Sequence, residues 1–82
     1  MTVYVDRPRH HAHKRKRYAH LLSVDKAELH KFAEMIGVKR HFFHKDHYDI
    51  TDEQWHDAVI AGASVVTTRD LVLIRQGRRV KN

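Results

Sequence analysis

The sequence predicts a single small α/β domain over residues 1–82, and three observations support this fold class. A chain of 82 residues can build one small hydrophobic core, because it buries only somewhat more than about 60% of its unfolded surface. Short apolar stretches alternate with segments of helical periodicity, which favours a short mixed or partly parallel sheet with two or three amphipathic helices. Only three Gly and one Pro occur, which indicates an ordered chain.

Two strands and a basic loop are expected in the first part of the chain. Residues 2–5 have the pattern of a short strand, which ends at Asp6. Pro8 and a run of cations then interrupt this pattern, so we expect a basic, histidine-rich loop over residues 7–17. Residues 19–23 predict the second strand.

The first helix is indicated by a capping signal, an apolar stripe and a terminating glycine. Asp25 with Glu28 three residues later resembles a capping box, and Ser23 is a competing cap. Apolar side chains then recur at i, i+3, i+4 and i+7: Leu29, Phe32, Ala33 and Ile36. Gly37 stands where the C-terminus of this helix is expected.

A second strand-to-helix unit follows in the middle of the chain. Residues 41–43 and 48–50 are candidate strand pieces on either side of a polar bend. Thr51 with Gln54 makes another capping box, and the spacing of the apolar residues that follow predicts a helix over about 52–61.

The last quarter of the chain predicts one strand and an ambiguous tail. Residues 64–67 have the composition of a strand. Residues 69–76 form either a third helix that stops at Gly77 or one arm of a hairpin that turns at residues 76–77. The sequence favours the helix.

The net charge of the chain lies in its basic segment. Six cations and no acid occur within residues 7–17: Arg7, Arg9, Lys14, Arg15, Lys16 and Arg17. The other ten Lys and Arg residues are balanced by ten Asp and Glu residues, so the rest of the chain is neutral. We call residues 7–17 the basic arm, and it favours a partner rich in negative charge, with nucleic acid first.

The arm predicts binding to the nucleic-acid backbone rather than to a base sequence. Tyr18 follows the cations and could stack on a base. No helix-turn-helix, zinc finger or RNA-recognition signature accompanies the arm, so the expected contacts are with phosphates. The competing interpretation is a solvated loop that binds only nonspecifically.

A second group of residues predicts chemistry rather than binding alone. The candidate catalytic residues combine carboxylate and imidazole side chains: Asp6, His20, His47 and Asp49. In α/β sheets, working groups gather beyond the carboxyl ends of strands, where Asp6 is expected. Such a set can hold a divalent metal or act as acid and base on a phosphate ester.

The expected metal ligands are Asp6, His47 and Asp49, with His20 or His47 as a further ligand or general base. Carboxylates favour Mg²⁺ or Mn²⁺, whereas several imidazoles favour Zn²⁺ or Ni²⁺. Structural roles compete with this hypothesis. His47 could bind a backbone carbonyl, Asp49 could cap the second helix, and Asp6 could pair with an arginine of the arm.

The chain resembles one small bacterial and phage family, domain of unknown function 4031, over nearly its whole length. The similar segments are residues 1–6, 19–21, 28–33, 47–50 and 61–63, and the basic stretch that begins at Arg69. The resemblance implies a cytoplasmic domain without an established activity. Members of the family usually carry a second acid where this chain has Arg7, and often Trp where it has Tyr18.

Several classes of protein are excluded or disfavoured. The chain has no cysteine, which excludes disulfides and thiolate ligands and fits a cytoplasmic location. No apolar run approaches the roughly 20 residues of a membrane span, and residues 1–20 lack a signal-peptide core, so we expect no membrane association. Phosphate-binding Gly-rich loops and Gly-x-Ser-x-Gly motifs are absent.

Three functional hypotheses follow from the sequence. The first is a nucleic-acid-binding domain that acts through the basic arm without sequence specificity. The second is a metal-dependent phosphodiesterase or nuclease-like hydrolase that uses the Asp and His residues, with the arm holding substrate. The third is a phage-encoded interaction protein or inhibitor that docks on an acidic host protein. A second copy of the chain is also a candidate partner, because the core is small.

Overall fold

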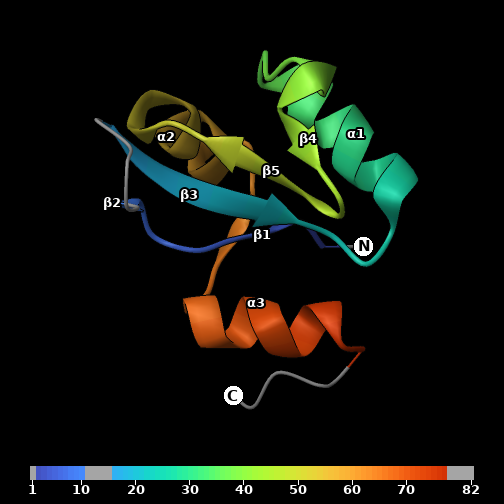
Figure 1. Ribbon diagram of the computed structural model, residues 1–82. Helices are drawn as coiled ribbons and strands as arrows, with labels where there is room; N and C mark the ends of the chain where they lie inside the picture. The colour runs from blue at the N-terminus through green and yellow to red at the C-terminus, as the bar shows by residue number, and fades with distance from the viewer. Residues whose placement is uncertain (1, 11–15, 78–82) are drawn as a thin grey trace.

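A mixed β-sheet lies at the centre of the computed structural model, which describes residues 2–10 and 16–77 (Figure 1). The strands are β1 Tyr4–Val5, β2 Arg9–His10, β3 Arg17–Leu22, β4 Phe43–His44, β5 His47–Ile50 and β6 Ser64–Val65. The helices are α1 Lys26–Met35, the short 3-10 helix η1 Arg40–Phe42, α2 Asp52–Ile60 and α3 Thr68–Arg75. Figure 1 shows α1 and α2 on one side of the sheet and α3 on the other.

The strands follow the order β4-β5-β3-β1-β6, and β2 pairs with the outer part of β3. The β1–β6 pair is parallel, whereas β1–β3, β3–β5 and β4–β5 are antiparallel. The predicted α/β class with a short, partly parallel sheet is therefore confirmed. Within the described parts of the chain, no helix has both the length and the apolarity that a membrane crossing needs.

Side-chain caps fix where each α-helix begins. The Asp25 carboxylate accepts from the Glu28 amide at 3.2 Å and caps α1, while the Ser23 hydroxyl donates to the Glu28 carboxylate. The predicted capping box of Thr51 and Gln54 is present in both directions at α2. A third capping box at Thr67 starts α3, so the tail is a helix, as the sequence favours.

Two apolar clusters hold the layers together. The larger cluster joins α1 and α2 to one face of the sheet, and its fully buried members include Val5, Leu21, Leu29, Tyr48 and Ile50. The smaller cluster joins α3 to the opposite face through Leu22, Leu71 and Ile74. Because side chains alternate along a strand, Leu21 and Leu22 serve different clusters.

Two local predictions are wrong. Residues 7–17 are not entirely a loop, because Arg9 and His10 pair with Tyr18 and Arg17 in an antiparallel ladder that extends β3. Residues 41–43 are not a strand, because the chain turns through η1 and only Phe43 enters β4. In both cases short-range composition is overridden by backbone hydrogen bonding to neighbouring segments.

The core of α1 provides a test of this packing. Leu29→Ala removes a side chain that is 0% exposed, so we expect the free energy of unfolding to fall by about 2–5 kcal/mol. Met35→Ala lies on the same helix but removes a side chain that is 64% exposed, and it should cost less than about 0.5 kcal/mol. Urea unfolding measures both. Equal losses in the two variants would contradict this assignment of the buried face.

Candidate metal centre

The register of the sheet brings the predicted polar residues onto one face. His20 lies opposite Asp49 in the β3–β5 pair, and the next backbone contact along β1 joins the Asp6 amide to the His20 carbonyl. Asp6, His20 and Asp49 thus form a row across three neighbouring strands. His47 precedes Asp49 by two residues on β5, so alternation places it on the same face. This face is the one that α3 covers.

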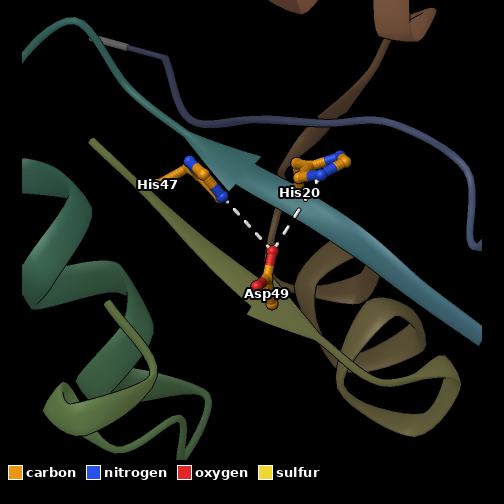
Figure 2. A group of neighbouring side chains, drawn as sticks. All are labelled: His20, His47 and Asp49. Atoms are coloured by element: carbon orange, nitrogen blue, oxygen red, sulfur yellow. Dashed lines mark ion pairs between the residues drawn. The ribbon is translucent and has the colours of Figure 1, made fainter. Parts of the chain in front are cut away.

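Three of these side chains could share a metal ion: His20, His47 and Asp49. One donor atom from each lies within 4.8 Å of the others. Figure 2 shows both imidazole rings directed at the Asp49 carboxylate. The Nε2 atom of His47 lies 3.3 Å from Asp49 Oδ1, and the Nε2 atom of His20 lies 4.0 Å from the same oxygen.

A buried carboxylate holds His20 from behind. Asp6 is 0% exposed, and its Oδ1 accepts from the His20 backbone amide at 2.7 Å. Its Oδ2 lies 2.9 Å from His20 Nδ1 and accepts from the Thr68 hydroxyl at 2.8 Å. Burial alone would raise the pKa of Asp6, but these hydrogen bonds outweigh it and hold the pKa below its ordinary value.

The ionised Asp6 in turn sets the state of His20. The hydrogen bond to Asp6 raises the pKa of His20 above its ordinary value, against the opposing effect of burial. Because a carboxylate only accepts, Nδ1 carries the proton of this bond, and Nε2 is the atom directed at Asp49. A carboxylate that fixes the tautomer in this way is a common support for histidine ligands of metals.

His47 is held by a second carboxylate in the same manner. Asp46 Oδ1 lies 2.9 Å from His47 Nδ1, and Asp46 Oδ2 accepts from Arg75 Nε at 2.7 Å. Burial raises the pKa of Asp46, but the bonds to His47 and Arg75 prevail and keep the pKa below its ordinary value. Lys45 and Asp46 form the two-residue turn between β4 and β5, with Lys45 at a φ of 59°.

This donor set fits a transition metal better than magnesium. Two imidazole nitrogens and one carboxylate oxygen suit Zn²⁺, Mn²⁺ or Fe²⁺, whereas Mg²⁺ prefers oxygen ligands alone. With metal–ligand bonds of about 2.0–2.1 Å, ligand atoms of a tetrahedral site lie about 3.3 Å apart. The His47–Asp49 separation of 3.3 Å meets this requirement, whereas His20 Nε2, at 4.0 Å from the same oxygen, would move closer when a metal binds. Three protein ligands would leave a coordination position open for water or substrate, as in catalytic sites.

A small pocket lies beside the three residues, under α3. Its volume is about 80 Å³, and its lining includes His20, His47, Thr68 and Arg75. A pocket of this size can take a small group such as a phosphoryl group. Arg9 lies next to it and donates to Thr68 Oγ1 at 3.4 Å.

The structure gives a position to each of the four predicted catalytic residues. His20, His47 and Asp49 converge, whereas Asp6 stands behind His20 with both carboxylate oxygens engaged, so its place is that of a supporting residue. Among the residues that the structure describes, none of the three competing structural roles is observed. Asp6 pairs with His20, His47 binds the Asp46 carboxylate, and the cap of α2 is Thr51.

Three residues of the site are missing from the sequence-based set: Asp46, Thr68 and Arg75. Asp46 had a local signal, because it directly precedes His47 within the predicted polar bend. Thr68 and Arg75 are seven residues apart, which places them on one face of a helix, but nothing in the sequence says what that face meets.

Among the described cations of the basic arm, Arg9 and Arg17 lie on the paired strands β2 and β3, Lys16 directly precedes β3, and Arg7 lies between β1 and β2. All four are exposed. Lys14 and Arg15 lie outside the described residues. Arg17 pairs with Asp52 at 2.9 Å, but both side chains are close to half exposed, so the pair adds at most about 1 kcal/mol and competes weakly with a phosphate. Tyr18 is half-buried opposite Arg9.

The fold and site define a small α/β domain with a two-histidine, one-carboxylate cluster on its sheet. The chain belongs to the family described as protein of unknown function (DUF4031), whose model matches residues 3–78. Neither a curated protein nor a solved structure matches the chain. The family match therefore assigns no chemistry to the chain, and the chemistry of the site must be argued from its own residues.

Asp6 and Asp49 should differ sharply in their effects on stability. Asp6→Ala removes the partner of the His20 amide and of its partly buried imidazole, so the free energy of unfolding should fall by about 3–5 kcal/mol. Asp49→Ala should change it by less than about 0.5 kcal/mol, because this side chain is 42% exposed. Thermal and urea unfolding of the metal-free protein test the pair. A large loss in Asp49→Ala would indicate a structural role for Asp49.

Proposed function

We propose that this protein is a metal-dependent phosphodiesterase that acts on nucleic acid. The observation that carries the proposal is the convergence of His20 and His47 on Asp49, with each Nδ1 atom held by its own carboxylate. A surface pair of histidines with no support would lack this orientation. Two independently supported imidazoles that meet at one exposed carboxylate form a site with little evident structural purpose.

The charge balance of the site supports an anionic substrate. Three carboxylates surround the two histidines, and two guanidinium groups accompany them, which leaves one net negative charge: Asp6, Asp46, Asp49, Arg9 and Arg75. A bound divalent ion changes this sum to one net positive charge. The loaded site would therefore attract a phosphate diester more strongly than the metal-free site.

The reaction follows from these groups. A bound divalent metal would supply an activated water and neutralise charge on the phosphoryl oxygens. A water oxygen would bond to phosphorus as the P–O ester bond breaks, and the proton that the water loses would pass to the departing oxygen. The pocket under α3 accepts the phosphoryl group, with Arg75 in its wall. The basic arm supplies the affinity for the rest of the nucleic acid.

The hydrolytic role is tested with Asp49→Asn. Labelled single-stranded and duplex DNA and RNA are incubated with the protein and Mn²⁺ or Zn²⁺, then separated on a denaturing gel. We expect cleavage by the wild-type protein and a loss of at least about 100-fold in Asp49→Asn, because one ligand of the metal is removed. Binding of nucleic acid should survive this substitution, since Asp49 carries no positive charge.

The matched control is Asp57→Asn, which neutralises an exposed carboxylate on α2. It should cleave at the wild-type rate. Full activity in highly purified Asp49→Asn would rule out the proposed role of Asp49. If the wild-type protein binds nucleic acid but never cleaves it, the protein is a binding domain. If it does neither, an acidic protein partner becomes the explanation of the arm.

The role of the arm is tested by the salt dependence of binding. If all six cations contact duplex phosphates, the slope of log K against log salt is about −5, and neutralising Lys14, Arg15, Lys16 and Arg17 should reduce it to about −2. The control neutralises Lys26 and Lys31, two exposed lysines of α1, and should leave the slope unchanged. Fluorescence anisotropy at several salt concentrations gives the slopes. An unchanged slope in the arm variant would exclude phosphate contacts by the arm.

A further inference from the structure

One face of α3 is turned towards the candidate metal centre. Thr68, Leu71, Val72 and Arg75 all line the small pocket beside the two histidines, and they occur at i, i+3, i+4 and i+7. This spacing defines a single helix face, with apolar residues at its middle and a polar residue at each end. The two polar residues are about 10 Å apart along the helix axis, at a rise of about 1.5 Å per residue.

Thr68, the polar residue at the start of this helix face, contacts Asp6, the carboxylate that supports His20. The Thr68 hydroxyl donates to Asp6 Oδ2 at 2.8 Å, and this same oxygen is bonded to His20 Nδ1. Thr68 also accepts from the Arg9 guanidinium at 3.4 Å, which joins α3 to the base of the basic arm. Asp6 is 0% exposed, so this contact lies inside the molecule, where a hydrogen bond to a charged group is strong.

Arg75, the polar residue at the end of this helix face, contacts Asp46, the carboxylate that supports His47. Arg75 Nε donates to Asp46 Oδ2 at 2.7 Å, while Asp46 Oδ1 is bonded to His47 Nδ1. Arg75 is 44% exposed and Asp46 is 24% exposed, so this contact is more open to water than the first. Each histidine is therefore held by a carboxylate, and each of these carboxylates is held by a residue of α3.

We propose that Thr68 and Arg75 are positioning residues for the metal centre, which α3 places at the two supporting carboxylates to fix the orientation of His20 and His47. This inference deepens the proposed function and rests on its metal site. Neither residue touches the metal. Both act through Asp6 and Asp46, and they set the affinity of the site for the ion.

The docking of α3 is suited to this role because its apolar contact with the sheet is small. Leu71 and Ile74 pack against Leu22, with Tyr4 and Val66 at the margin, whereas α1 and α2 share the much larger cluster on the opposite face. The hydrogen bonds of Thr68 to Asp6 and of Arg75 to Asp46 therefore supply a substantial part of the interaction that fixes the position of α3 on the sheet. Metal binding and the position of α3 are coupled through the same four hydrogen bonds.

The test measures metal affinity in the absence of substrate. Co²⁺ and Zn²⁺ are titrated into metal-free protein in competition with a chromophoric chelator. We expect Arg75→Gln and Thr68→Val each to weaken binding by about 10–100-fold. The control is Arg69→Gln, an exposed arginine of the same helix, which should bind as the wild type does. Thr68→Ser and Arg75→Lys retain a donor and should recover most of the lost affinity.

A second readout separates positioning from a general loss of structure. In metal-free protein, NMR of the ring nitrogens should show His47 with its proton on Nδ1 in the wild type. A mixture of tautomers should appear in Arg75→Gln, while circular dichroism shows the same helix content. If Arg75→Gln unfolds the protein, the metal affinity of Thr68→Val and the ring-nitrogen signals of His20 in that variant decide the question.

The outcomes distinguish this inference from the proposed function. Wild-type affinity in both Arg75→Gln and Thr68→Val would overturn the positioning role and leave the proposed hydrolase intact. Metal binding without any cleavage would refute the hydrolase, while the relative affinities of the variants would still support or overturn the role of α3. A wild-type protein that binds neither Co²⁺ nor Zn²⁺ would overturn both.

Discussion

The buried carboxylate of Asp6 is the group on which the rest of the structure depends. It lies at the end of β1, and its two oxygens accept from β3 at the His20 amide and ring and from α3 at the Thr68 hydroxyl. The backbone carbonyl of the same residue accepts from Trp55 Nε1 of α2 at 2.7 Å. One residue thus connects four elements. A buried charge of this kind is tolerated only with all of its partners present, because each unpaired ion costs several kcal/mol.

This constraint also separates stability from chemistry within the site. The carboxylate oxygens of Asp6 and Asp46 bind the Nδ1 atoms of the two histidines and the polar side chains of α3. Asp49 has no such commitment among the described hydrogen bonds, and its side chain is 42% exposed. The supporting acids are ionised by their surroundings, and their histidines are oriented towards the third acid. A site with rigid supports and an accessible centre is the arrangement that metal catalysis requires.

The basic arm and the candidate metal centre are neighbours in space. The β2–β3 pair extends the same strand that carries His20, so on the proposed function a nucleic acid held by the arm would lie next to the strand that carries the site. Arg9 belongs to the arm and also contacts Thr68, which bonds Asp6. Six cations occur within residues 7–17 and the rest of the chain is neutral, so long-range attraction for an anionic partner is concentrated on this segment of the sequence.

The sequence by itself determined the local elements and the residue types of the site. The Thr51 capping box, the apolar stripe that contains Leu29 and the terminating Gly37 are signals within a few residues, and each is found in its predicted place. Where an element depends on hydrogen bonds between distant segments, the sequence pattern predicted the structure less accurately. The pairing of Arg9 with Tyr18 replaced part of the expected loop.

Only the tertiary structure decided which side chains meet. The strand register brought His20 opposite Asp49, and the docking of α3 brought Arg75 to Asp46, across 29 residues of sequence. Asp6 changed from an expected ligand to a supporting residue for the same reason, since its oxygens face β3 and α3. Register and helix docking are set by the burial of two apolar clusters, which depends on the whole chain at once and leaves no signal near any one of these residues.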